Sequence, residues 1–203
     1  MKKANYMIFL ICSIFLICSL TSCKAKQEDV SSVNTMSEQE ESEPGNSVSE
    51  QTKGDMTSFS ASTLSGGTFT QEDLADYDMT VINIWATTCG YCIEEMEGLE
   101  KLYEQLPENV NFISICADAT YNMELAEEIL KKKGATFETL IGNSSLDNAI
   151  LQYITGTPTT VFTDSEGNLV GSPIIGAPCI EDMDRAASIY LKEVENHLKE
   201  LDQ

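Results

Sequence analysis

The pattern of hydrophobic and polar residues divides the 203-residue chain into three parts. Residues 1–22 have a basic start and then a short apolar run from Tyr6 to Leu20. Residues 23–55 show no apolar periodicity and are rich in Ser, Glu, Gln, Asn and Gly. In residues 56–203 apolar positions recur with the periods of strands and helices. This last part is long enough to form one ordinary domain with its own core.

The periodic part predicts an α/β domain. Strands are expected at runs rich in Val and Ile that polar turns bound: Met79–Trp85, Val110–Ala117, Phe137–Ile141, Thr159–Thr163 and Leu169–Ile175. Helices are expected where apolar residues recur every three or four positions: Ile93–Leu106, Met123–Lys133, Leu146–Ile154 and Ile180–Leu201. A β-hairpin around Gly66-Gly67 and a helical turn from Thr70 precede them. Early parallel crossovers and a final antiparallel pair predict a mixed central sheet flanked by helices.

The helix expected at Ile93–Leu106 is amphipathic. Its apolar face holds Ile93, Met96, Leu99, Leu102, Tyr103 and Leu106. The opposite, polar face holds Glu94, Glu95, Glu97, Glu100 and Lys101. This pattern predicts a helix that covers the sheet with its apolar side.

Two cysteines, Cys89 and Cys92, lie where a buried strand passes into this helix. Free N–H groups and the positive end of the helix dipole at the first cysteine favour a thiolate, and Cys92 would lie one turn inside, within reach of a mixed disulfide. A CxxC pair is also half of a zinc site. A second ligand pair is missing, however, since the one histidine is His197 and the cysteines Cys116 and Cys179 are isolated. We therefore predict a redox dithiol with no metal and no other cofactor.

The start of the chain is typical of an exported protein. A basic start, a short apolar core and small residues describe a secretory signal over residues 1–22. Leu20-Thr21-Ser22-Cys23 resembles the bacterial lipobox, which implies lipidation of Cys23 as the mature N-terminus. The alternatives are an ordinary signal peptide with Cys23 as a chance residue, or an uncleaved anchor. We expect a lipid-anchored protein on the extracytoplasmic face of the bacterial cell membrane, with residues 23–55 as a flexible tether.

The charge excludes some partners. The formal net charge is −21, and it becomes −23 when Lys2 and Lys3 leave with the signal segment. Such a chain does not bind nucleic acid or anionic lipid headgroups by electrostatics. Lipid must therefore hold it to the membrane.

The motif from Val81 to Cys92, together with Gly156-Thr157-Pro158 before the last strand pair, resembles the thioredoxin fold. Within that fold it is similar to the membrane-anchored TlpA/ResA-like thiol–disulfide oxidoreductases, whose inserted strand and helix match the elements between Gly134 and Ile154. The resemblance implies that Cys89 is the nucleophile and Cys92 the resolving cysteine of a redox disulfide.

The same resemblance implies a substrate-binding edge. Pro158 would be cis and face the dithiol, and Thr157 would pair with an extended substrate peptide; an ordinary trans proline is the alternative. Gly90 and Tyr91 would also contact substrate. Trp85 would do so too, with a core tryptophan as the alternative.

Other features depart from the family or remain open. The two positions at which relatives carry a buried acid are here Asn83 and, approximately, Ser62, so no acid is expected near the dithiol. We expect Cys116 to be a small buried hydrophobe and Cys179 to lie at the N-terminus of the last helix, near the dithiol face. A Cys116–Cys179 disulfide would need Cα atoms within about 7 Å.

We therefore expect a protein-disulfide reductase that acts on exported proteins with disulfides. Family substrates include apocytochrome c and methionine sulfoxide reductases, and a CcdA/DsbD-type membrane protein restores the dithiol in the family. A redox-inert peptide-binding lipoprotein with the same fold is the main alternative. A peroxidatic use of Cys89 is a third hypothesis, although peroxidases of this fold usually lack a near resolving cysteine such as Cys92.

Overall fold

The computed structural model describes residues 54–201. The predicted signal segment, most of the tether and the lipidation residue Cys23 lie outside the described residues. The strands are β1 (Ser60–Ser62), β2 (Thr68–Thr70), β3 (Met79–Trp85), β4 (Val110–Cys116), β5 (Glu138–Ile141), β6 (Thr159–Asp164) and β7 (Ile174–Ile175). The helices are η1 (Gln71–Asp76), α1 (Gly90–Tyr103), α2 (Ala119–Lys133), α3 (Ser144–Ala149), η2 (Leu151–Tyr153) and α4 (Met183–Leu201).

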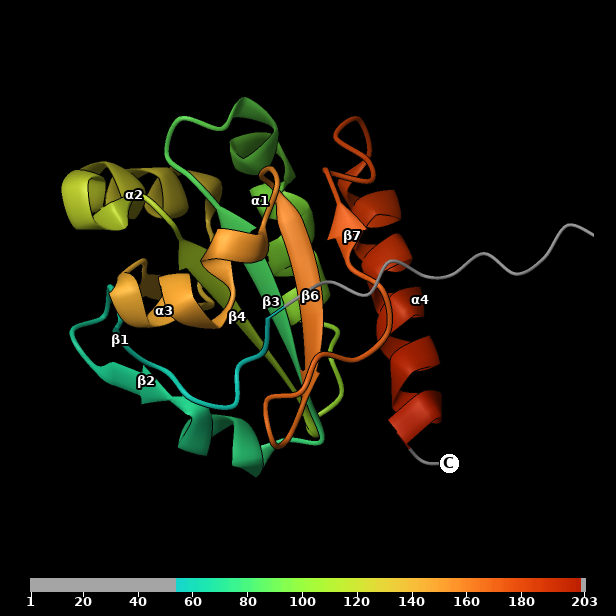
Figure 1. The fold of residues 1–203 in the computed structure, drawn as a ribbon. Helices are drawn as coiled ribbons and strands as arrows, with labels where there is room; N and C mark the ends of the chain where they lie inside the picture. The colour runs from blue at the N-terminus through green and yellow to red at the C-terminus, as the bar shows by residue number, and fades with distance from the viewer. Residues whose placement is uncertain (1–53, 202–203) are drawn as a thin grey trace, which may run out of the picture. The chain divides into compact units, whose positions relative to one another are not determined.

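Five strands form one mixed sheet in the order β5-β4-β3-β6-β7, with β3 at its centre (Figure 1). Strands β3, β4 and β5 are parallel neighbours, while β6 runs antiparallel to β3, and β7 antiparallel to β6. Strands β1 and β2 form a separate antiparallel hairpin. The structure confirms the predicted fold class: a mixed sheet flanked by helices, an N-terminal hairpin, and a strand and helix inserted before the final pair.

Alternation along β3 separates two apolar layers. Side chains such as Val81 and Trp85 pack in one layer with residues of α1, α2 and α4. Side chains such as Ile82 and Ile84 pack in the other layer with α3 and the N-terminal segment. Asn83 lies on the first face, so a polar residue is placed in the layer that α1 and α4 cover.

The first long helix begins and ends three residues earlier than predicted. Helix α1 begins at Gly90, because Cys89 has extended backbone angles and its sulfur accepts the Cys92 N–H at the helix start. It ends at Tyr103, so Leu106 lies in the following turn. The early start places the whole C-terminal half of the CxxC motif inside the helix.

The end of the chain also differs from the prediction. Within the range expected for the returning strand only β7 forms a ladder, with an isolated bridge between Thr163 and Leu169. Gly171 has φ +63°, and Pro173 lacks the N–H that a ladder needs. Helix α4 begins at Met183 rather than at the position predicted.

Two further expectations concern the cysteines and the predicted third helix. Cys179 lies in the loop before α4, and the carboxylate of Asp182 instead accepts the Arg185 N–H at the start of α4. Cys116 and Cys179 are both free thiols, so they form no disulfide.

The expected third helix is divided into α3 and η2. Across residues 54–201, the structure contains no helix with the length and apolar character needed to cross a membrane.

Candidate active site

The two cysteines of the CxxC motif are joined as a disulfide at the N-terminus of α1, with their Cα atoms 5.3 Å apart. Cys89 is the N-cap, and its Sγ lies 3.2 Å from the backbone nitrogen of Cys92. Cys89 is partly exposed, whereas Cys92 is completely buried. An incoming reagent can therefore reach only the first sulfur, and that sulfur lies where a helix start stabilises negative charge.

The loop before β6 faces this sulfur. The peptide bond between Thr157 and Pro158 is cis, the isomer that the family resemblance implies. The carbonyl oxygen of Thr157 lies 3.4 Å from the Cys89 sulfur. The carbonyl of Pro158 accepts the Gly176 N–H at 2.8 Å, which fixes the loop against the residues after β7. Thr157 itself is exposed, so its backbone is accessible beside the disulfide.

Apolar side chains near the dithiol are open to solvent, but the tryptophan is not among them. Tyr91, between the two cysteines, is 63% exposed, and Gly90 is exposed as well. Ile175, which pairs with Thr159 in the register of β6 and β7, is 70% exposed. Trp85 is 0% exposed, and its indole N–H donates to Ser114. The expectation that Trp85 contacts substrate is therefore wrong, because its side chain is a core residue.

A buried acid lies below the dithiol, contrary to the sequence prediction. Glu95 is 0% exposed, although the helical pattern assigned it to the polar face. It follows Cys92 by three residues, and side chains at this spacing lie on the same face of a helix. Its Oε1 accepts a hydrogen bond from Asn83 at 3.1 Å, and its Oε2 accepts one from the Tyr190 hydroxyl at 2.8 Å. The expectation of no acid near the dithiol is thus wrong.

The surroundings of Glu95 move its pKa towards neutral pH. Burial raises the pKa of Glu95 from 4.5 to about 7, and the hydrogen bonds from Tyr190 and Asn83 limit that rise. Burial, with the Glu95 charge beside it, also raises the pKa of Tyr190, so the phenol stays a donor. A group that titrates near neutral pH one helical turn from a buried cysteine can accept that cysteine's proton.

A second carboxylate holds the loop that precedes Cys89. Asp118 accepts the Thr87 N–H at 2.9 Å and the Thr87 hydroxyl at 2.6 Å. It also accepts the Cys116 thiol at 3.4 Å and the Asn122 amide at 3.2 Å. Burial, together with the bond to Asp118, raises the pKa of the Cys116 thiol to about 12. Cys116 is therefore a neutral, buried donor, and not a second nucleophile.

Sequence reasoning missed these polar residues for different reasons. The sequence did contain a signal for Glu95. Its position lies on the same helical stripe as Cys92 and Leu99, and an acidic residue in an otherwise apolar stripe indicates a specific role. Asp118 and Tyr190 had none, since only the fold brings them to the dithiol. Ser62, which was aligned with an acid position in relatives, is exposed on β1. Among residues 54–201 no group of three or more His, Cys, Asp or Glu side chains could hold a metal ion.

Comparison with solved structures shows the same fold in disulfide oxidoreductases. A secreted Mycobacterium tuberculosis disulfide oxidoreductase homologous to E. coli DsbE is 20% identical, with a TM-score of 0.53 over 66% of this chain and 94% of that one. A thioredoxin-family thiol:disulfide interchange protein from Chlorobium tepidum is 23% identical, with a TM-score of 0.53 over 70% and 96%. A DsbF homologue from Corynebacterium diphtheriae is 17% identical, with a TM-score of 0.54 over 73% and 96%.

The family comparison covers more than half of the chain. No curated protein matches the sequence significantly. The model of the AhpC/TSA family matches residues 53–172, which include the CxxC motif and the cis-proline loop. The chain belongs to the AhpC/TSA family and shares its fold with the disulfide oxidoreductases named above.

Proposed function

We propose that this protein is an extracytoplasmic, lipid-anchored disulfide reductase that acts on exported proteins through Cys89 and Cys92. One observation carries the proposal: the disulfide lies at the N-terminus of α1, with only Cys89 accessible and the cis Thr157–Pro158 loop beside it. A structural disulfide has no need of an open edge next to one of its sulfurs.

In the reduced protein the Cys89 thiolate attacks a sulfur of the substrate disulfide. The substrate S–S bond breaks, a mixed disulfide with Cys89 forms, and the first substrate sulfur leaves as a thiolate that takes a proton from solvent. Cys92 then loses its proton and attacks the Cys89 sulfur. The Cys89–Cys92 bond forms, the mixed disulfide breaks, and the second substrate thiolate leaves. Two electrons have passed from the protein to the substrate.

Two features of the site serve these steps. The buried Cys92 cannot give its proton directly to water, and Glu95 is the titratable group one turn away that can accept it. The exposed backbone of Thr157 and the side chains of Tyr91 and Ile175 would bind an extended substrate segment on either side of Cys89. Gly90 adds no side chain, which keeps the approach to Cys89 open.

The sequence supports the location and the partners that we propose. The signal segment and Cys23 would place the domain on the outer face of the membrane, where substrates carry disulfides. Because each cycle leaves Cys89 and Cys92 oxidised, an electron donor must return them to the dithiol. The family resemblance points to a CcdA/DsbD-type membrane protein as that donor, and to apocytochrome c or a methionine sulfoxide reductase as the substrate.

Insulin reduction by dithiothreitol tests the enzyme role, comparing residues 54–203 with their Cys89→Ser variant. We expect the wild type to accelerate reduction and the variant to lose at least nine-tenths of that acceleration, since among residues 54–201 Cys89 is the accessible cysteine that caps a helix. Cys179→Ser, which removes a free thiol outside the motif, is the matched control and should keep wild-type activity. Equal activity of wild type and Cys89→Ser would refute the reductase and favour a binding protein with an inert disulfide.

The partner can be identified with a Cys92→Ser variant of the full-length protein. Without the resolving sulfur, the mixed disulfide at Cys89 accumulates and can be isolated from membranes. A Cys23→Ala variant in the same cells should appear in the soluble fraction or stay as an uncleaved precursor. Membrane attachment that does not depend on Cys23 would remove the lipid anchor from the proposal but leave the chemistry intact.

A further inference from the structure

Four buried polar side chains meet between the sheet and two helices. Asn83 comes from β3, Glu95 from α1, Thr160 from β6 and Tyr190 from α4, and none is more than 1% exposed. The Asn83 amide donates to Glu95 at 3.1 Å and to the Thr160 hydroxyl at 3.0 Å, and the Tyr190 hydroxyl donates to Glu95 at 2.8 Å. Burying four polar side chains costs free energy unless they form hydrogen bonds with one another. Each side chain therefore restricts the orientation of the side chain to which it bonds.

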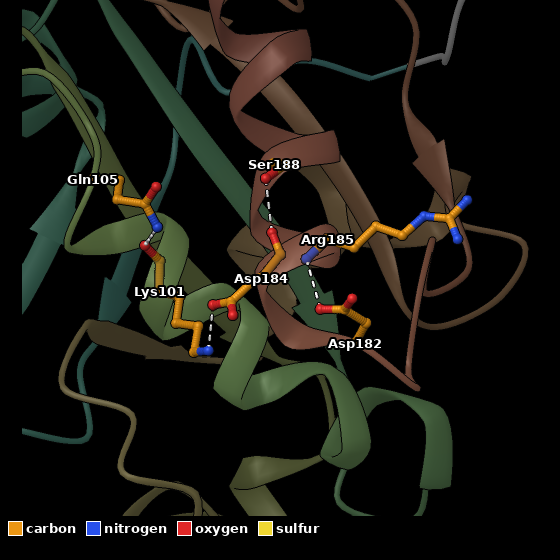
Figure 2. Close-up of polar contacts among 6 residues, drawn as sticks. All are labelled: Lys101, Gln105, Asp182, Asp184, Arg185 and Ser188. Carbon is orange, nitrogen blue, oxygen red and sulfur yellow. Dashed lines mark hydrogen bonds and ion pairs between the residues drawn. The ribbon is translucent and has the colours of Figure 1, made fainter.

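The packing of α4 on α1 decides where the Tyr190 hydroxyl lies. The two helices meet in a register defined by three contacts along α1, which are Lys101 with Asp184, Gly98 with Ala186, and Glu95 with Tyr190. Figure 2 shows the first of these contacts, with the Lys101 ammonium against the Asp184 carboxylate. A Cβ on Gly98 would come within 2.9 Å of the Ala186 side chain, so the glycine permits the close approach. Tyr190 follows Ala186 by one helical turn, which places its phenol against Glu95.

The two hydrogen-bond partners of Glu95 differ in how many acceptors their donors serve. The Asn83 amide divides its donors between Glu95 and Thr160, and the Asn83 carbonyl oxygen has no hydrogen-bond partner. An asparagine in this position can rotate and satisfy Glu95 in either protonation state. The Tyr190 hydroxyl donates its single proton to the carboxylate at 2.8 Å, while the Thr160 hydroxyl bonds to the phenol and lowers its pKa, as a donor to the phenol oxygen does. Tyr190 therefore discriminates between the ionised and the neutral carboxyl.

We propose that Tyr190 is a positioning residue of the redox reaction: it holds the Glu95 carboxyl below Cys92 and sets the pH at which that carboxyl exchanges the proton of the dithiol. The proposal rests on the proton-acceptor role given to Glu95 in the proposed function. The titratable groups that face Glu95 are Tyr190 from α4 and Cys92 from α1. The strands β3 and β6 present only the uncharged Asn83 and Thr160.

The test is the reduction potential of the Cys89–Cys92 pair between pH 5 and 9, measured against glutathione in wild type, Glu95→Gln and Tyr190→Phe. We expect the wild-type curve to change slope where Glu95 titrates and the Glu95→Gln curve to lack that change. Tyr190→Phe removes only a hydroxyl that stabilises the ionised carboxyl, so the change of slope should move up by about one pH unit. Tyr103→Phe is the matched control and should follow the wild type, because Tyr103 is the last residue of α1 and is 40% exposed.

A second variant keeps the hydroxyl and should shift the pH of the slope change in the opposite direction. Replacement of Tyr190 by 3-fluorotyrosine makes the phenol a stronger donor, so the change of slope should move to lower pH. Opposite shifts from two nearly isosteric side chains would not result from loosened packing. A Tyr190→Phe or fluorotyrosine curve that coincides with wild type, while Glu95→Gln differs, would refute the positioning role alone. Identical curves for wild type and Glu95→Gln would refute the proton acceptor, and loss of all exchange activity would refute the proposed function itself.

Discussion

Two carboxylates lie on the two sides of the CxxC motif in the chain's path, Asp118 bonded to the loop before Cys89 and Glu95 in the helix after Cys92, and their surroundings give them opposite properties. Glu95 is completely buried below Cys92, and burial raises its pKa to about 7 despite two hydrogen bonds. Asp118 is partly exposed beside the loop that precedes Cys89. Desolvation opposes its charge, but hydrogen bonds from Thr87, Cys116 and Asn122 outweigh that cost and lower the pKa of Asp118. The number of donors and the access of water therefore decide which carboxylate holds a fixed charge and which exchanges a proton.

The difference assigns separate tasks to the two sides of the active site. A carboxylate that remains ionised at all physiological pH values is suited to hold the Thr87 backbone and hydroxyl, and so the turn that ends at Cys89. A carboxyl that titrates near neutral pH holds structure less firmly but can take up and release a proton during each cycle. Mutations on the two sides should therefore differ in their effect on stability and in its dependence on pH.

The largest expected effect is the contribution of Glu95 to the pH dependence of the free energy of unfolding. A carboxyl whose folded pKa of about 7 exceeds its ordinary 4.5 binds more protons in the folded state between these values, so stability falls as pH rises. The fall amounts to about 3 kcal/mol, at about 1.4 kcal/mol per pH unit. Urea unfolding of the oxidised protein at pH values from 4.5 to 8 measures this change. Over that range the free energy of unfolding of Glu95→Gln, relative to that of the wild type, should increase by the same amount.

Glu94→Gln is the matched control for this measurement. Glu94 adjoins Glu95 in α1 but is exposed, so its substitution removes no buried carboxyl and should not reproduce the change seen with Glu95→Gln. If the Glu95→Gln and wild-type curves remain parallel over the whole range, Glu95 is not the buried, proton-binding group that distinguishes its side of the dithiol.

The next effect concerns Asp118 and has the opposite pH dependence. Asp118→Ala leaves the Thr87 N–H and hydroxyl without their charged acceptor, which should cost about 2 kcal/mol of unfolding free energy at pH 7. Because the folded pKa of Asp118 is lowered from its ordinary value of 3.8, its contribution is present above that value and is lost as pH falls through the folded pKa. Urea unfolding at pH 7 and pH 3 should show a smaller loss at pH 3, with exposed Asp76→Ala as the control. An equal loss at both pH values would mean that Asp118 acts through packing and not through its charge.

The sequence predicted the elements of the fold better than the polar partners of the dithiol. The strand Met79–Trp85 was predicted with its observed limits, because Val and Ile in a run bounded by polar residues admit few other structures. The hairpin at Gly66-Gly67 and the helical turn after Thr70 were also predicted, and Thr70 forms a capping box with Asp73. These features depend on neighbours in the sequence.

The residues that surround the disulfide depend on contacts between distant segments. Asp118 meets Thr87 only because β4 lies beside β3, and Tyr190 meets Glu95 only because α4 packs on α1. The family resemblance implied that Trp85 meets substrate, but helices from distant parts of the chain cover its face of β3, so the alternative of a core tryptophan holds. Glu95 was assigned to the polar face because carboxylates are rarely buried, which is a rule that functional sites break.

The smallest expected effect is the loss of the hydrogen bond between the Thr87 hydroxyl and Asp118. Thr87→Val removes the hydroxyl bond to Asp118 but keeps the backbone N–H bond and the shape of the side chain, so it should cost about 1 kcal/mol at pH 7. Because the lost bond is to Asp118, the double variant Thr87→Val with Asp118→Ala should be less destabilised than the sum of the single variants by about the same amount, as urea unfolding of all four proteins can measure. Thr87→Val with Glu95→Gln should be additive, since the two residues share no partner. Coupling of Thr87 to Glu95 instead of to Asp118 would show that the two sides of the dithiol act as one network, and the separation of their tasks would then be wrong.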